Sequence, residues 1–149
     1  LFNHESPLRG NEFVTKKIIS DLAKVKFNII SDLRLGNIYA KRDWGYSNDY
    51  VIAMWKMLQQ KKPDDYVIAT GKIYGLNDFV NEAFSSLNLN WEKHVILNDS
   101  RKRPSEIKSG FGSPIKANSK LNWHAKTYMP EIACIMAREE FNLLKGINS

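Results

Sequence analysis

The feature that most constrains the fold is an alternation of long segments with helical periodicity and short apolar segments. Between residues 12 and 27, apolar side chains recur every three or four positions, which predicts a helix with one buried stripe: Val14, Ile18, Leu22 and Val25. The apolar run 66–70, closed by Gly71, predicts instead a buried strand of a parallel sheet. Helices that alternate with such strands indicate an α/β layer architecture.

The same alternation continues along the chain. We expect a helix from Ser47 and three further helices that begin near residues 77, 114 and 130, with another strand over 91–97. Asn11 and Ser47 are the expected N-caps of the first two helices. The polar stretch 42–45 is expected to be a loop.

The composition excludes several classes of protein. The 149 residues include one cysteine, Cys134, which excludes an internal disulfide framework and a cysteine-built zinc site. We expect this thiol to be a small buried hydrophobic residue. The three histidines lie far apart in sequence, so no metal site is predicted, and no apolar run approaches the length of a membrane span. We therefore expect one soluble, cytoplasmic domain with no membrane partner.

The net charge does not point to a nucleic-acid partner. The 22 Lys and Arg residues exceed the 16 Asp and Glu residues by six, but the basic residues are scattered along the chain. No long basic block and no RNA-binding motif accompanies them. A few placed basic residues suit a small polyphosphate ligand equally well.

Three polar segments contain the candidate binding residues. Residues 3–7 follow an apolar pair that has the character of a strand end, with Arg9 and Lys17 close behind, and the other segments are 42–45 and 103–106. Ligands bind at the carboxyl ends of parallel strands, and arginine matches phosphate oxygens. Together these segments would suit a diphosphate that carries a sugar. The sequence has no dinucleotide-binding glycine fingerprint and no Tyr-x-x-x-Lys pair.

Several motifs occur in a specific order: Leu-Phe-Asn-His-Glu-Ser-Pro at 1–7, Lys-Arg-Asp-Trp-Gly-Tyr at 41–46, Asp-Tyr-Val-Ile-Ala-Thr-Gly at 65–71 and Arg-Pro-Ser-Glu at 103–106. In these motifs the chain resembles the GDP-mannose 4,6-dehydratases, a family of the extended short-chain dehydrogenase/reductase superfamily. The resemblance covers nearly the whole chain. It implies that residues 1–149 form the last strands of a Rossmann-type parallel sheet with a small, mostly helical substrate-binding lobe.

The resemblance also implies an activity. The family converts GDP-mannose to GDP-4-keto-6-deoxymannose, the precursor of GDP-fucose, with bound NADP, and its members form dimers or tetramers. The family's catalytic Thr, Glu and Tyr-x-x-x-Lys would all precede Leu1. We therefore expect the chain to be the C-terminal part of a longer polypeptide, to contain no catalytic residue and to be inactive alone.

The resemblance assigns binding roles residue by residue. His4 and Arg9 match positions that contact NADP. The positions that hold GDP-mannose are matched by Asn3, Val14, Lys17, Arg42, Arg103 and Glu106. In the roles that we expect, the two substrate arginines face the diphosphate, Lys17 and Val14 border the guanine, Glu106 accepts from the ribose hydroxyls, and Asn3 contacts the sugar or the first phosphate.

Two alternatives stay open at this point. The chain could belong to another sugar-nucleotide epimerase or dehydratase of the same superfamily, in which case the fold and the cofactor would be the same but the sugar would differ. It could also be a non-catalytic module that binds a nucleotide sugar or RNA.

Overall fold

The computed structural model describes residues 1–98 and 109–147. Its helices are α1 (Val14–Lys26), α2 (Ser47–Leu58), α3 (Leu76–Ser86), α4 (Ile115–Leu121) and α5 (Met129–Ile147), with a 3-10 turn, η1 (Trp91–Lys93). Its strands are short: β1 (Asn3–Glu5), β2 (Leu33–Leu35), β3 (Lys41–Arg42), β4 (Trp44–Tyr46), β5 (Tyr74–Gly75), β6 (Val95–Leu97) and β7 (Ser109–Gly110).

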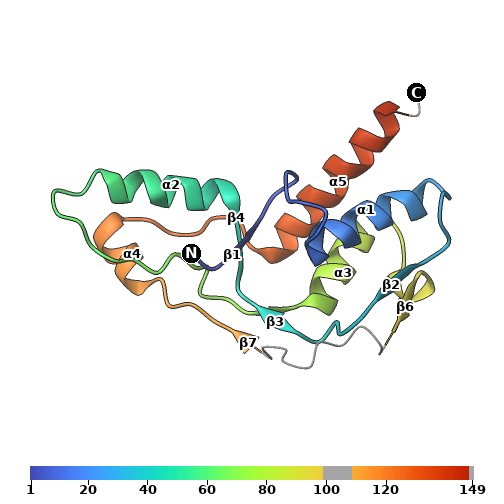
Figure 1. Cartoon of the computed structure of the whole chain (residues 1–149), viewed down its shortest axis with the longest axis horizontal. Helices are drawn as coiled ribbons and strands as arrows, with labels where there is room; N and C mark the ends of the chain where they lie inside the picture. The colour runs from blue at the N-terminus through green and yellow to red at the C-terminus, as the bar shows by residue number, and fades with distance from the viewer. Residues whose placement is uncertain (99–108, 148–149) are drawn as a thin grey trace.

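The strands pair over long distances in the sequence, mostly in parallel. β1 runs parallel to β4, with Asn3 opposite Trp44 and Glu5 opposite Tyr46. β2 runs parallel to β6. In a third sheet, β3 lies between β5, to which it is antiparallel, and β7, to which it is parallel. Figure 1 shows β1 and β4 between two groups of helices, α1, α3 and α5 on one side and α2 with α4 on the other.

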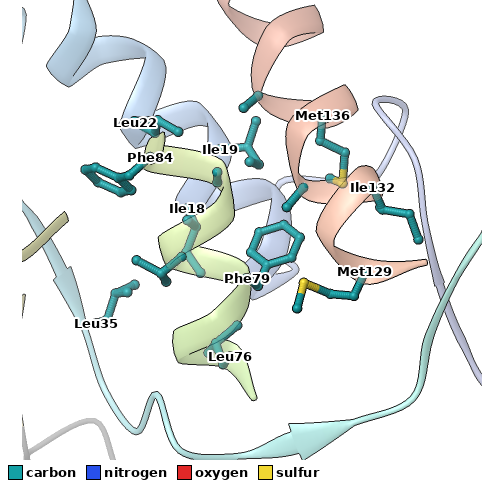
Figure 2. Packing of buried hydrophobic residues seen from close by; sticks show 14 of the residues in the cluster. Ile18, Ile19, Leu22, Leu35, Leu76, Phe79, Phe84, Met129, Ile132 and Met136 are labelled. Atoms are coloured by element: carbon teal, nitrogen blue, oxygen red, sulfur yellow. The ribbon is translucent and has the colours of Figure 1, made fainter. Parts of the chain in front are cut away.

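The larger core lies between α1, α3 and α5. Apolar faces of the three helices meet there, and the side chains at their contact are at most 1% exposed: Ile18, Ile19, Leu22, Phe79, Phe84, Met129, Ile132 and Met136. Figure 2 shows the Phe79 ring and the Met129 side chain pointing into the space between these helices. Burying large side chains of this kind is the dominant stabilising term for a domain of this size.

A smaller core joins α2 to α4. Tyr50 and Ala53 of α2 pack with Ala117 and Leu121 of α4 around the buried Ile68. At the start of α2 the buried Asp49 carboxylate accepts the backbone N–H groups of residues 126 and 127, at 2.8 and 2.9 Å. These bonds fix the segment after α4 against α2 and give the buried Asp49 carboxylate two backbone partners.

Several sequence-based predictions are wrong in detail. Residues 42–45 are not a loop, because Lys41–Arg42 and Trp44–Tyr46 are strands whose partners lie far away in sequence. The run 66–70 belongs to no strand ladder among the described residues, although Phe2 donates its backbone N–H to the Ile68 carbonyl at 2.9 Å. Within 91–97, the first three residues form η1 and only the last three a strand.

The expected N-caps are also wrong. Phe13 and Tyr46 are the cap residues of α1 and α2, and neither makes a side-chain cap hydrogen bond. Ser47 lies inside α2 and donates its hydroxyl to the Glu5 carbonyl at 3.0 Å, so it joins α2 to β1. Cys134 is half-buried, not fully buried.

Candidate functional site

A cleft of about 670 Å³ lies between β1, the start of α1, the end of β2 and β3. Its lining residues come mainly from β1, from the loop that precedes α1, from the first turns of α1, and from β2, β3 and the segment between them. The polar and charged residues that line it are Asn3, Glu5, Arg9, Glu12, Thr15, Lys17, Arg34, Asn37 and Arg42.

Five of the eight residues that the sequence predicts as binding residues line this cleft: Asn3, Arg9, Val14, Lys17 and Arg42. They come from four separate segments of the chain. Val14 and Lys17 are three residues apart in the first turns of α1 and therefore share a face of the helix. Val14 is 45% exposed, so it borders the cleft and does not belong to the buried stripe that the sequence predicted.

The remaining three predicted residues lie elsewhere. His4 is half-buried and is not in the cleft lining, because side chains alternate across a strand and Asn3 and Glu5 occupy the cleft side of β1. Its ring lies against Tyr50 of α2, with ring centroids 5.0 Å apart. Arg103 and Glu106 lie outside the described residues.

The cleft lining is predominantly cationic. Arg9, Lys17, Arg34 and Arg42 are opposed by two carboxylates, of Glu5 and Glu12. Glu12 is exposed, whereas Glu5 is 3% exposed. A concave surface with an excess of arginine and lysine side chains favours an anionic ligand, and guanidinium groups suit phosphate oxygens in particular.

The buried Glu5 carboxylate interacts with two other residues of the cleft lining, Thr15 and Arg9. Its Oε2 accepts the Thr15 hydroxyl at 2.9 Å and lies 3.3 Å from Arg9 Nε. Burial raises the pKa of Glu5, while the Arg9 charge, the Thr15 hydrogen bond and the His4 charge act in the opposite direction. Arg9 of the following loop and Thr15 of α1 therefore offset only part of the effect of burial on the pKa of this carboxyl group.

A second buried carboxylate fixes the strand that carries Arg42. Asp43 is 1% exposed, and its oxygens accept the Thr70 N–H at 2.9 Å, the Thr70 hydroxyl at 2.7 Å and the Gly71 N–H at 2.9 Å. Gly71 has a φ of +74°, which a residue with a side chain rarely adopts. Asp43 thereby ties the extended run 66–70 to the junction of β3 and β4.

Several residues of this site were not predicted from the sequence. None of the following cleft-lining residues was among the predicted binding residues: Glu5, Glu12, Thr15, Arg34 and Asn37. Glu5 could have been found, since a residue two positions from Asn3 in a strand must share its face. Arg34 lies between the buried Leu33 and Leu35, a pattern typical of a strand with one face exposed.

The arrangement is suited to binding an anion. Within residues 1–98 and 109–147, no group of three or more His, Cys, Asp or Glu side chains could hold a metal ion. Burial raises the pKa of the half-buried Cys134 thiol, which makes a nucleophilic thiolate less accessible there. Of the helices that the structure describes, none has the length and apolar character to cross a membrane.

Comparisons with known proteins agree with the motifs. The family model for GDP-mannose 4,6 dehydratase matches residues 1–136. GDP-mannose 4,6 dehydratase 1 of Arabidopsis thaliana is 44% identical over 145 residues, which are 97% of this chain and 40% of the relative. The Homo sapiens relative, GDP-mannose 4,6 dehydratase, is 38% identical over 162 residues, covering 97% of this chain and 44% of the relative. The chain thus spans about two fifths of the length of these curated relatives.

Solved structures share the fold. RMD from Pseudomonas aeruginosa, complexed with NADPH, superimposes with a TM-score of 0.85 at 15% identity over 95% of this chain and 46% of that one. dTDP-glucose 4,6-dehydratase from Bacillus anthracis, in complex with NAD, gives 0.74 at 14% identity over 97% of this chain and 44% of that one. These likenesses confirm the expected α/β fold class. From the match over residues 1–136 and the identity to its relatives, the chain belongs to the GDP-mannose 4,6 dehydratase family.

Proposed function

We propose that this chain is the substrate-recognition part of an enzyme that converts GDP-mannose to GDP-4-keto-6-deoxymannose. The observation that carries the proposal is the cleft of about 670 Å³, in which cations from separate segments meet. A diphosphate carries its charge in the middle of the ligand, so several convergent arginine and lysine side chains favour it over a neutral sugar. Family membership supplies the identity of the nucleotide and the sugar.

Each of the proposed binding residues would contact a different part of GDP-mannose. Arg42, together with Arg103 from outside the described residues, would bind the diphosphate. Lys17 and Val14 would border the guanine from the exposed face of α1, where the exposed methyl groups of Val14 offer an apolar contact. Asn3 would donate to the sugar or the first phosphate, and Glu106 would accept from the ribose hydroxyl groups.

NADP is the proposed cofactor, with His4 and Arg9 as its contacts on this chain. The fit is supported by the Arg9 side chain, which lines the cleft and is 25% exposed, so that part of its guanidinium group is accessible to a ligand oxygen. When bound, NADP would supply the hydride acceptor and donor of the reaction. The chain's own residues would bind and orient the two ligands, since the family's acid and base residues match no part of this sequence.

We propose further that the active protein is a homo-oligomer, a dimer or tetramer, as the family resemblance implies. Activity then belongs to the whole protein and not to these 149 residues alone. Recognition of GDP-mannose, in contrast, is a property that these residues can be tested for directly.

The first test is calorimetric titration of the chain with GDP-mannose, with UDP-glucose and with a short RNA. We expect GDP-mannose to bind more tightly than UDP-glucose. Arg42→Ala should lower the affinity for GDP-mannose by about 10- to 100-fold, which is the usual cost of removing a charge-assisted hydrogen bond. Arg138→Ala, which removes an exposed arginine of α5 outside the cleft, is the control and should leave affinity unchanged. Tighter binding of RNA, with a steep salt dependence, would overturn the proposal.

The second test concerns turnover. A chimaera in which this chain replaces the matching part of the Arabidopsis thaliana relative should form GDP-4-keto-6-deoxymannose from GDP-mannose, and Arg42→Ala in the chimaera should raise KM. A folded chimaera that binds GDP-mannose and releases it unchanged would contradict the activity while leaving the recognition role in place.

A further inference from the structure

The guanidinium group of Arg9 is held between two partners. On one side the Glu5 carboxylate lies 3.3 Å from Arg9 Nε, and on the other the guanidinium carbon lies 3.3 Å from the centroid of the Phe13 ring. The three residues are spaced four apart along the chain, so the loop between β1 and α1 folds back to bring them together. Arg9 is partly buried, with 25% of its side chain exposed at the cleft.

The Glu5 carboxylate is itself fixed more firmly than the arginine. Its side chain is 4% exposed, and its Oε2 also accepts the Thr15 hydroxyl of α1 at 2.9 Å. The backbone carbonyl of Glu5 accepts the Ser47 hydroxyl of α2 at 3.0 Å. Three elements therefore converge on this one residue, and its carboxylate position is determined by β1, α1 and α2 together.

A buried carboxylate in this place is not explained by stability. Burial raises the pKa of Glu5, which means that the surroundings disfavour the charged form. Replacing both members of a buried ion pair by packed apolar residues is often neutral or stabilising, so a pair such as Glu5 and Arg9 is weak evidence for a stabilising role. The charge is therefore better accounted for by what it does to Arg9, the cation beside it in the cleft.

We propose that Glu5 is the positioning residue for Arg9, holding its guanidinium group in one orientation for a phosphate group of the bound dinucleotide. An arginine with a free side chain loses rotamer freedom when it binds a ligand, and an arginine that is already ordered does not. The inference rests on the proposed function, in which Arg9 contacts the cofactor. It adds a residue that acts through Arg9 and does not itself touch the ligand.

The first experiment needs no ligand. In the 15N-labelled chain, the Arg9 Nε–Hε cross-peak, identified by its loss in Arg9→Lys, should be sharp and slow to exchange with water. In Glu5→Gln, which keeps the side-chain volume, the peak should broaden or move to the position of an exposed arginine. An unchanged Arg9 peak in Glu5→Gln would overturn the proposal whatever the ligand.

The second experiment is a double-mutant cycle on affinity for NADP, measured in the chimaera with the Arabidopsis thaliana relative. Glu5→Gln should lower the affinity for NADP by about tenfold, and Arg9→Ala should lower it by at least as much. The double variant should lose no more affinity than Arg9→Ala alone, because Glu5 acts only through Arg9. Losses that multiply would show that Glu5 acts independently and would overturn the proposal. A folded wild-type chimaera that binds no NADP would refute the cofactor assignment, a failure distinct from an unchanged Arg9 cross-peak.

A matched control separates positioning from general stability. Glu140 on α5 is paired with Lys16 of α1 at 2.6 Å, and each of the two side chains is 12% exposed. Glu140→Gln therefore removes a partly buried carboxylate that also contacts α1 but lies outside the cleft. It should leave both the Arg9 cross-peak and the NADP affinity unchanged. A loss of affinity equal to that of Glu5→Gln would mean that any weakening of the α1 contacts has this effect, and it would refute the positioning role.

Discussion

Replacing Asp43 by asparagine should destabilise the protein through loss of the anchor between the β3–β4 junction and the run 66–71. The asparagine oxygen can keep the two Thr70 donors, at 2.9 and 2.7 Å in the wild type, but its NH2 group then faces the Gly71 N–H, which loses its 2.9 Å bond. A lost bond to a charged acceptor costs about 1.5–3 kcal/mol, and an unsatisfied buried donor adds about 1–3 kcal/mol. Relief of the desolvated charge offsets part of this, so we expect about 3 kcal/mol.

Urea unfolding followed by tryptophan fluorescence measures this effect. With an m-value of about 2 kcal/mol/M, a loss of about 3 kcal/mol lowers the urea midpoint by about 1.5 M. Asp64→Asn is the matched control, because Asp64 also accepts a short bond, from Lys116 at 2.6 Å, but both side chains are 47% exposed. It should leave the midpoint unchanged. If Asp43→Asn and Asp64→Asn have the same midpoint, the claim that Asp43 holds this part of the site together is refuted.

Three further predictions concern other parts of the chain. The raised pKa of Glu5 means that the folded state binds this proton more tightly than the unfolded state does. The free energy of unfolding of the wild type should therefore fall relative to that of Glu5→Gln as the pH rises from about 4 to 7. A constant difference between the two free energies across that range would contradict this. Gly45→Ala places a methyl group against the buried Tyr50 ring and should cost about 1–3 kcal/mol in urea unfolding, whereas an unchanged midpoint would show that the ring can move. Ile132→Ala, at a position with no exposure in the main core, should cost about 2–5 kcal/mol by the same assay, and a smaller loss would mean that α5 packs loosely there.

The helices were predictable because the apolar residues that they bury recur with helical spacing in the sequence. The stripe in α3 is an example: Phe79, Val80 and Phe84 are spaced as the sequence requires, and all three are fully buried. The strands were less predictable, because a strand of two or three residues is defined by its partner. Nothing near Arg42 in the sequence indicates that Tyr74 and Gly110 lie opposite it.

The site was predictable in its residue types and less so in its geometry. Resemblance to the family singled out Asn3, Lys17 and Arg42, and the fold brings all three to one cleft. Glu5 was missed because its burial arises from α1 and α2, which reach it only in the folded chain. His4 was grouped with Arg9 by the resemblance, yet strand alternation turns its side chain toward Tyr50.

Binding of the nucleotide sugar in this cleft can be observed residue by residue by titrating the 15N-labelled chain with GDP-mannose and recording NMR spectra. We expect the backbone amide signals of Asn3, Val14, Lys17 and Arg42 to shift as GDP-mannose is added, and those of α4 to stay in place. Shifts confined to residues outside the cleft, or no shifts at saturating GDP-mannose, would contradict it.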